Sequence, residues 1–194
     1  MADSSATPRA SRRADAAQNR ARILDAARTA LAESGEASMQ SIAKRAGVGQ
    51  GTLYRHFPTR ESLVLEVHRR DVTDLVELAP QLLTSLRPVT ALRAWLDRLA
   101  EYGRIKRGLA GAFHAATHQQ LAAEGYGPVI GAIEILLDAG KKDGSIRRDI
   151  AAGELLILVG FLWSPDADAD REARARHMLD LVMDALRSPV ATAG

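Results

Sequence analysis

The spacing of apolar residues along the chain is that of α-helices, and it is clearest in the first third. Between residues 19 and 34 apolar side chains recur every three or four positions, which predicts an amphipathic helix that ends at Gly35. A shorter stretch of the same kind begins at Met39. Ser38 can accept a hydrogen bond from its first free backbone amides, and Gly47 can take the left-handed conformation that follows a helix end. The pattern therefore predicts two helices, each closed by a glycine.

A third short helix is expected directly after this turn, from about Gly49 to Phe57. Its inward positions are apolar: Val48, Leu53 and Phe57. Its opposite face is polar: Gln50, Thr52, Tyr54, Arg55 and His56. Gly49 and Gly51 keep the helix slim enough to enter a DNA major groove. Two short helices around a tight glycine turn are typical of a helix-turn-helix, although a plain helical hairpin in an all-α core has a similar pattern.

The rest of the chain continues the helical pattern. A fourth helix, capped by Thr59, should run to about Leu78, and Pro80 and Pro88 bracket a break after it. Further helices are expected from Val89, at about 109–123, at 129–139, at 151–163 and at about 171–186, with a turn at the GYGP sequence of residues 125–128. Because the segment 151–163 is apolar nearly all round, we expect it to be buried on more than one side. The sequence predicts an all-α protein of about nine helices.

These elements fall into four segments. Residues 1–17 are rich in Ala, Ser and Arg with almost nothing to bury, so we expect a disordered basic arm. Residues 18–64 form the three-helix head, and the long fourth helix joins it to a second helical domain over residues 65–188. Residues 189–194 are expected to be a flexible tail.

Composition and charge narrow the function. The 194 residues include no cysteine, which excludes disulfides, thiolate metal sites and thiol redox sensing. Up to Arg70 the chain has 12 Lys and Arg against 7 Asp and Glu, a net charge of +5, whereas the remainder has 14 against 17, a net charge of −3. The positive field thus lies with the helix-turn-helix, where DNA phosphates would lie. Neither a secretory signal nor a membrane span is visible, so we expect a cytoplasmic protein.

Two runs of sequence carry a family resemblance. RILDAARTALAESG and SIAKRAGVGQGTLYRHFPTRESL resemble the TetR family of one-component repressors over about residues 20–67. The ALRAWLDRLAEY run looks like the SbtR-like subgroup. The resemblance implies a DNA-binding head, a helical domain that encloses a pocket for a small-molecule inducer, and a dimer built from the last two helices.

The DNA contacts then follow residue by residue. Tyr54 and His56 would bind phosphates, together with the start of the preceding helix at Met39 and Ser41 and the side chain of Arg60. Bases or nearby backbone would meet Gln50, Thr52 and Arg55, with Gly51 allowing close approach. Arg12 and Arg13 of the arm would follow the backbone or enter the minor groove, unless the arm is only a solvated tail. One departure from the family pattern is Gly49, which stands where serine or threonine is common, so a side-chain cap is missing there.

The two strongly apolar C-terminal helices independently suggest a dimer, because a chain of this length has little else to cover them. The alternative is that they only complete a monomeric core. The residues expected at the interface are Leu155, Leu158, Leu162, Met178, Leu179, Val182 and Leu186. A two-fold dimer would hold its recognition helices about one DNA turn apart, ~34 Å, and so predicts a palindromic operator.

The inducer pocket is expected among the aromatic residues of the second domain and a few polar neighbours. Its candidate residues are Trp95, Leu99, Tyr102, Phe113, His114, Thr117, His118, Tyr126, Glu134, Phe161 and Trp163. Ordinary core packing is an equal explanation for any one of these aromatics. His114 and His118 have the spacing of a metal-binding pair, but no third ligand is evident beside them, so we expect no metal and no cofactor.

The sequence also lacks the motifs of an enzyme: there is no phosphate loop, no GxSxG and no cysteine nucleophile. The resulting interpretation is a ligand-responsive, homodimeric transcriptional repressor that binds double-stranded DNA and is released by an unknown small molecule. Two alternatives remain open. One is a transcriptional activator, and the other is a helical small-molecule-binding or scaffold protein whose head contacts protein instead of DNA.

Overall fold

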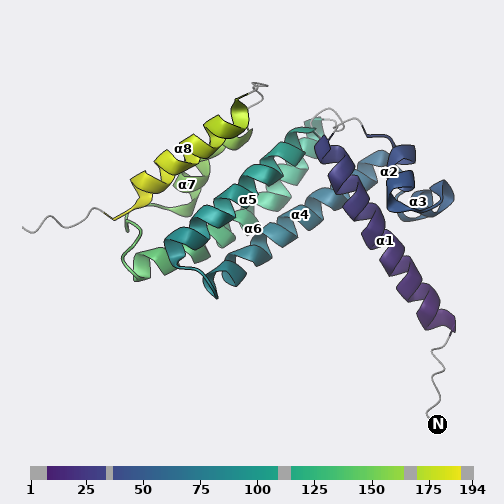
Figure 1. Cartoon of the computed structure of the whole chain (residues 1–194), viewed down its shortest axis with the longest axis horizontal. Helices are drawn as coiled ribbons and strands as arrows, with labels where there is room; N and C mark the ends of the chain where they lie inside the picture. Colours follow the sequence, from purple (N-terminus) through teal and green to yellow (C-terminus); the bar gives the residue numbers. More distant parts are fainter. Residues whose placement is uncertain (1–7, 34–36, 109–114, 164–169, 189–194) are drawn as a thin grey trace, which may run out of the picture. The chain divides into compact units, whose positions relative to one another are not determined.

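A computed structural model describes residues 8–33, 37–108, 115–163 and 170–188, and the side chains within these ranges except at 8–12, 104–108, 115–123 and 171. The described residues form eight α-helices and one 3-10 helix, without a strand; a single bridge joins Ile146 and Arg187. The helices are α1 (Pro8–Glu33), α2 (Met39–Ala46), α3 (Gln50–His56), α4 (Arg60–Leu83), α5 (Pro88–Gly108), α6 (Ala115–Lys142), α7 (Ala152–Leu158), η2 (Gly160–Trp163) and α8 (Arg171–Leu186) (Figure 1). The all-α prediction is confirmed.

The chain divides into two compact units. The first, which we call the head, contains the described residues up to His68, and the second begins at Arg69. Helix α4 is continuous through this boundary, so it contributes its first turns to the head and its later turns to the second unit.

The head has its own core, formed where α2 and α3 pack on α1. The apolar stripe predicted for residues 19–34 is buried, as are most of the inward positions of the next two helices: Ile23, Leu24, Ala27, Leu31, Ile42, Ala43, Ala46, Leu53 and Phe57. Val48, also predicted to face inward, is half-buried. Helix α1 begins at Pro8, not near Asn19, so residues 8–17 are helical and the expected disorder is corrected there. The alanines and arginines of this segment favour a helix even without a core to pack on, and proline suits a first helical position.

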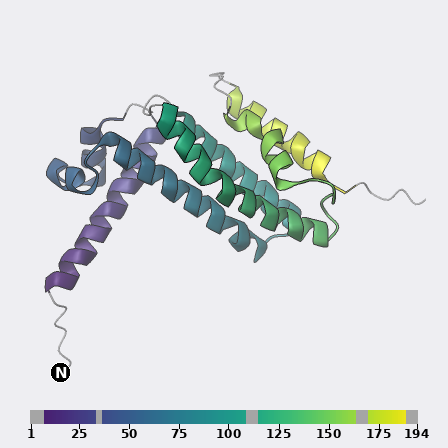
Figure 2. The same ribbon diagram turned by 180° about the vertical axis from the view of Figure 1, so that it is seen from behind.

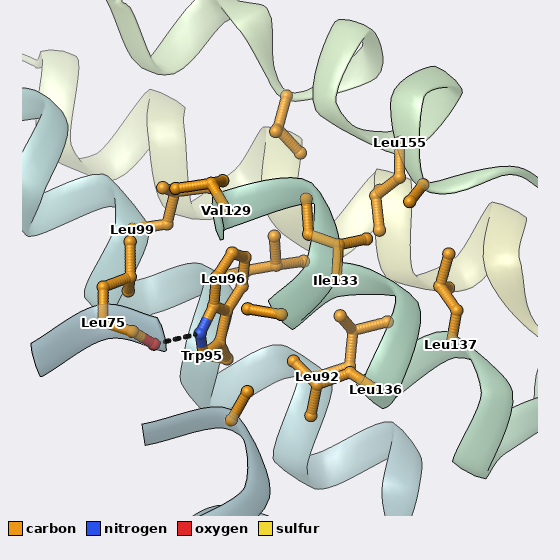
Figure 3. Close-up of a cluster of buried hydrophobic side chains, with 14 of the residues drawn as sticks. Leu75, Leu92, Trp95, Leu96, Leu99, Val129, Ile133, Leu136, Leu137 and Leu155 are labelled. Atoms are coloured by element: carbon orange, nitrogen blue, oxygen red, sulfur yellow. Dashed lines mark hydrogen bonds between the residues drawn. The ribbon is translucent and has the colours of Figure 1, made fainter. Parts of the chain in front are cut away.

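In the second unit α5, α6 and the later turns of α4 lie side by side, and α7 and α8 pack beside each other (Figures 1 and 2). Trp95 is at the centre of the core between these helices, fully buried, and its indole nitrogen donates to the carbonyl oxygen of Leu75 at 2.8 Å (Figure 3). This bond satisfies the only polar atom of the Trp95 side chain. The residues around it are aliphatic: Leu92, Leu96, Leu99, Ile133 and Leu136.

Three prolines were read from the sequence as breaks, and two of them are not. Pro80 lies inside α4, which continues to Leu83, and Pro128 lies inside α6, so the GYGP sequence is not a turn. A proline inside a helix costs about 3 kcal/mol, but both side chains are exposed while the neighbouring Ala79 and Val129 are buried. Packing on the flanking positions outweighs the lost hydrogen bond. Pro88, in contrast, is the first residue of α5, where proline is well suited.

The expected helix over 151–163 is divided. Helix α7 ends at Leu158, and the 3-10 helix η2 follows it. In the single chain this segment is buried on one side only, because Ile157 is 79% exposed and Leu158 51% exposed. Helix α8 has the predicted bounds, and its Asp180 forms an ion pair with Arg93 of α5.

Candidate nucleic-acid interface

The start of α2 is held by Ser38, as the sequence predicts. Its hydroxyl oxygen accepts a hydrogen bond from the backbone amide of Ser41 at 3.1 Å, and the Ser41 hydroxyl donates back to the Ser38 carbonyl at 2.8 Å. Both serines are exposed and Met39 is half-buried. The positive end of the α2 dipole is thus open to solvent, which suits a phosphate group.

Gly47 makes the turn between α2 and α3. Its φ is 64°. Its amide donates to the carbonyl oxygen of Lys44 at 3.1 Å, and the amide of Val48 donates to the carbonyl oxygen of Ala43 at 3.1 Å. This pair of bonds is a Schellman motif, which satisfies the last carbonyl groups of α2. Only Val48 and Gly49 then separate this turn from the first residue of α3.

Helix α3 is anchored by few residues. Leu53 is fully buried within it, and Phe57 at its C-cap is buried as well. Gln50, Gly51, Tyr54 and Arg55 are exposed, whereas Thr52 and His56 are half-buried. The polar face predicted from the sequence is therefore present on the outside of the head.

Arg55 lies along the surface of its own helix. Its Nε donates to the Gly51 carbonyl at 3.2 Å and its Nη2 to the Thr52 hydroxyl at 3.4 Å. A guanidinium group has five donors, so these bonds orient the group and leave other donors for an acceptor outside the protein. Tyr54, on the same helix, is 48% exposed.

Neither the backbone conformation nor the described neighbouring atoms require glycine at Gly49, the N-cap of α3, or at Gly51 in its first turn. A Cβ atom added at Gly49 or Gly51 would meet nothing within 4 Å, and neither residue has a positive φ. Gly49 is the N-cap and makes no side-chain cap hydrogen bond, as the departure from the family pattern implies. Open space at these positions means that any close neighbour must come from outside the head.

The first turn of α4 contacts the segment that leads into α2. Thr59 and Ser62 cap it reciprocally: the Ser62 amide donates to the Thr59 hydroxyl at 3.0 Å, and the Thr59 amide donates to the Ser62 hydroxyl at 3.2 Å. Arg60 is half-buried and its Nε donates to the Ala37 carbonyl at 3.3 Å, so it also holds the segment that leads into α2.

One exposed cation of α2 was not singled out from the sequence. Lys44 is exposed in the last turn of α2, beside Arg45, which pairs with Glu33 at 2.8 Å. The only signal in the sequence was the position of Lys44 on the polar side of a short helix. Of the two arginines predicted in the arm, Arg13 is exposed on α1 and the side chain of Arg12 lies outside the described residues.

The predicted pocket residues are divided by the structure. Trp95, Leu99 and Tyr102 are buried, and Phe161 and Trp163 are half-buried. Tyr126 and Glu134 are exposed on α6 and do not join the buried residues. Phe113, His114 and the side chains of Thr117 and His118 lie outside the described residues, and among the residues described no group of side chains could hold a metal ion.

Tyr102 has the most perturbed surroundings of this set. Burial raises the pKa of its phenol well above the ordinary value, and the negative charge of Asp71 raises this pKa further. Asp71 is itself buried on α4. The phenol therefore stays protonated and can serve as a hydrogen-bond donor within the second unit.

The predicted dimer residues also separate into two groups. Leu155, Leu162, Leu179 and Leu186 belong to the core of the second unit, so they do not offer a surface to a partner. Leu158 is exposed, and Met178 and Val182 are half-buried. Two apolar side chains of these helices that the sequence analysis did not name, Ile157 and Leu181, are 79% and 56% exposed. Helical periodicity identifies the most apolar face, and in these helices that face packs inward.

Two short helices joined by a Schellman turn, the second with a polar exposed face, define a helix-turn-helix DNA-binding protein. Residues 23–67 match the family model described as bacterial regulatory proteins of the tetR family, and residues 87–188, more than half of the chain, match the SbtR-like C-terminal domain of transcriptional regulators. The chain belongs to the TetR family: it is a transcriptional regulator with a helix-turn-helix DNA-binding domain. Members of this family act by binding DNA and are not enzymes.

Solved structures agree with this assignment. The TetR transcriptional regulator SCO0520 from Streptomyces coelicolor is 36% identical with a TM-score of 0.78, over 88% of this chain and 99% of that one. A TetR regulatory protein from Mycobacterium vanbaalenii is 30% identical with a TM-score of 0.72, over 90% and 98%.

The chain spans about a third of the length of the curated relatives it matches. The HTH-type transcriptional regulator SAB2452 of Staphylococcus aureus is 42% identical over 66 residues, which are 33% of this chain and 36% of that protein. In the part of the chain that the structure describes, no helix has the length and apolar character needed to cross a membrane.

Proposed function

We propose that the protein is a ligand-responsive repressor that binds a palindromic operator as a homodimer in the cytoplasm and is released by a small-molecule inducer. The observation that carries the proposal is the exposed polar face of α3. That face projects from a head whose own core is complete without it.

On this proposal the head divides its contacts between phosphates and bases. Tyr54, His56 and the open start of α2 at Met39 and Ser41 bind phosphates, and Arg60 borders them. Lys44 adds a further cation to this group. Gln50, Thr52 and Arg55 face the bases, and Gly51 lets the DNA approach the helix backbone. Arg12 and Arg13 extend the cationic surface along the first turns of α1.

The proposed dimer uses the outward sides of α7 and α8. Ile157, Leu158 and Leu181 are large apolar side chains that are each more than half exposed, and a soluble monomer has little reason to present three of them on its last two helices. The family resemblance points to the same helices. An isologous interface there would present two heads to one duplex about 34 Å apart.

For the effector, the second unit has apolar side chains such as Leu99 and Trp95 beside the largely buried phenol of Tyr102. These surroundings suit a partly apolar molecule. Its binding would shift α4, the helix shared by the two units, and alter the spacing of the two heads.

Selection of bound duplexes from a random pool tests the proposal. The expected result is an inverted repeat whose half-sites are one helical turn apart, bound with an affinity that falls steeply as salt rises. A pool without enrichment, or binding that salt leaves unchanged, would instead favour a head that contacts protein. Selected duplexes that contain a single half-site would contradict the dimer.

A further inference from the structure

Arg20 connects three helices of the head. From α1, its Nη2 pairs with the Oε1 atom of Glu66 on α4, and its Cζ lies 5.5 Å from the centre of the Phe57 ring. The side chains of Arg20 and Glu66 are 44% and 31% exposed. A freely exposed ion pair contributes little, but here the guanidinium is also oriented by an aromatic face, which fixes its geometry.

Phe57 is the residue that ends α3. Its amide donates to the Leu53 carbonyl at 2.8 Å, and its ring is buried, 6.3 Å from the ring of His56. His56 is on the proposed DNA-binding face. A displacement of the Phe57 ring would therefore move the C-terminal end of α3 and the phosphate-binding side chain beside it.

Glu66 is the α4 partner in the ion pair with Arg20. It lies on α4 two residues before His68, the last residue of the head, and α4 continues from there into the second unit. Any rotation or shift of α4 at this point changes the distance between the Glu66 carboxylate and the Arg20 guanidinium. A contact of this kind has two arrangements, joined and separated, as a switch requires.

We propose that Arg20 and Glu66 are positioning residues for DNA recognition: their ion pair holds the end of α3 at Phe57 in register with α4, without either residue touching the DNA. Breaking the pair is the step by which movement of α4 reaches the recognition helix. This inference rests on the proposed operator binding. It adds a change within each head to the proposed change in spacing between the two heads.

A merely structural role would lower stability and weaken all DNA binding alike. A positioning role lowers the ratio of operator affinity to affinity for a scrambled duplex, because only base contacts require a correctly placed α3. This ratio is therefore the measurement that separates the two roles.

The test compares Glu66→Gln with a matched control, Glu33→Gln, in the full chain. Glu33 pairs with Arg45 at 2.8 Å and joins α1 to α2 in the same head. Each variant removes one negative charge, so both change the general attraction to phosphates in the same direction. Fluorescence anisotropy with the selected operator and with a scrambled duplex, at one salt concentration, gives the ratio for each.

We expect Glu66→Gln to lower the ratio roughly three- to thirtyfold, the range of couplings measured along connecting contacts, and Glu33→Gln to leave it unchanged. Arg20→Gln should lower the ratio similarly, and the double variant should be no worse than either single one. Thermal unfolding followed by circular dichroism identifies any variant that fails to fold.

Equal ratios for Glu66→Gln and Glu33→Gln, or additive losses in the double variant, overturn the inference. Wild-type protein that selects no duplex overturns it as well, but that result appears before any variant is made and belongs to the proposed function. The two failures are thus distinguishable.

Discussion

Arg22 on α1 lies against the backbone of Gly47 at the turn between α2 and α3. Its Nη2 donates to the Ala46 carbonyl at 2.7 Å and to the Gly47 carbonyl at 3.2 Å, and a Cβ added at Gly47 would lie 2.6 Å from this nitrogen. The φ of 64° therefore favours glycine at this turn, and a Cβ there would also displace the end of the Arg22 side chain.

Gly47→Ala is expected to destabilise the head by about 1–2 kcal/mol from backbone strain, and further through displacement of Arg22. Urea unfolding measures this loss. Gly144→Ala is the matched control, because Gly144 has a φ of 78° and open space around it, so only the strain applies. A loss at Gly47 no larger than that at Gly144 would show that the contact with Arg22 contributes nothing.

Gly51→Ala should separate stability from recognition. Alanine favours a helix over glycine by up to about 1 kcal/mol and fits the open space at this position, so the free protein should unfold at a slightly higher urea concentration. The added methyl group would stand between α3 and the DNA, so operator affinity should fall. An alanine variant that is more stable and binds the operator normally would refute close approach at Gly51.

Tyr54→Phe and Gln50→Ala should weaken DNA binding in different ways. Loss of the phenol removes a phosphate contact and lowers affinity for every duplex alike, whereas loss of the Gln50 amide relaxes preference at particular base pairs by about 1–3 kcal/mol each. A panel of operators with single substitutions measures both. Tyr126→Phe, at an exposed tyrosine of α6, is the control and should bind as the wild type does.

Leu181→Lys is expected to dissociate the proposed dimer, because it places a charge within an apolar interface on α8. Analytical ultracentrifugation should then show a monomer, and operator binding should lose its dependence on paired half-sites. Ile135→Lys provides the comparison, since Ile135 is 45% exposed on α6, outside the proposed interface. Dimers that persist in the Leu181 variant would locate the interface elsewhere.

Sequence reasoning predicted the head well because its signals are local. Ser38, Gly47 and Thr59 each act on backbone groups within a few residues, so the caps and the turn could be placed from residue types alone. Exposure of Gln50 and Tyr54 followed from the same periodicity that buried Leu53.

The second unit was less predictable because its helix bounds and the burial of its side chains depend on packing between segments that are distant in the sequence. Pro80 and Pro128 are tolerated only because the buried positions around them gain more than the prolines cost. Leu179 and Leu181 are the same residue type two positions apart, yet one is buried and the other exposed. Residue type alone could not decide which of them is exposed.

The small number of buried residues in α3 has a further consequence for the evolution of such a regulator. With Leu53 alone fully buried along the helix, substitutions at Gln50, Tyr54 or Arg55 leave the core untouched. If this face reads bases as proposed, a duplicated copy of the gene could therefore acquire a new target site through single replacements on it. The protein would remain folded after each replacement.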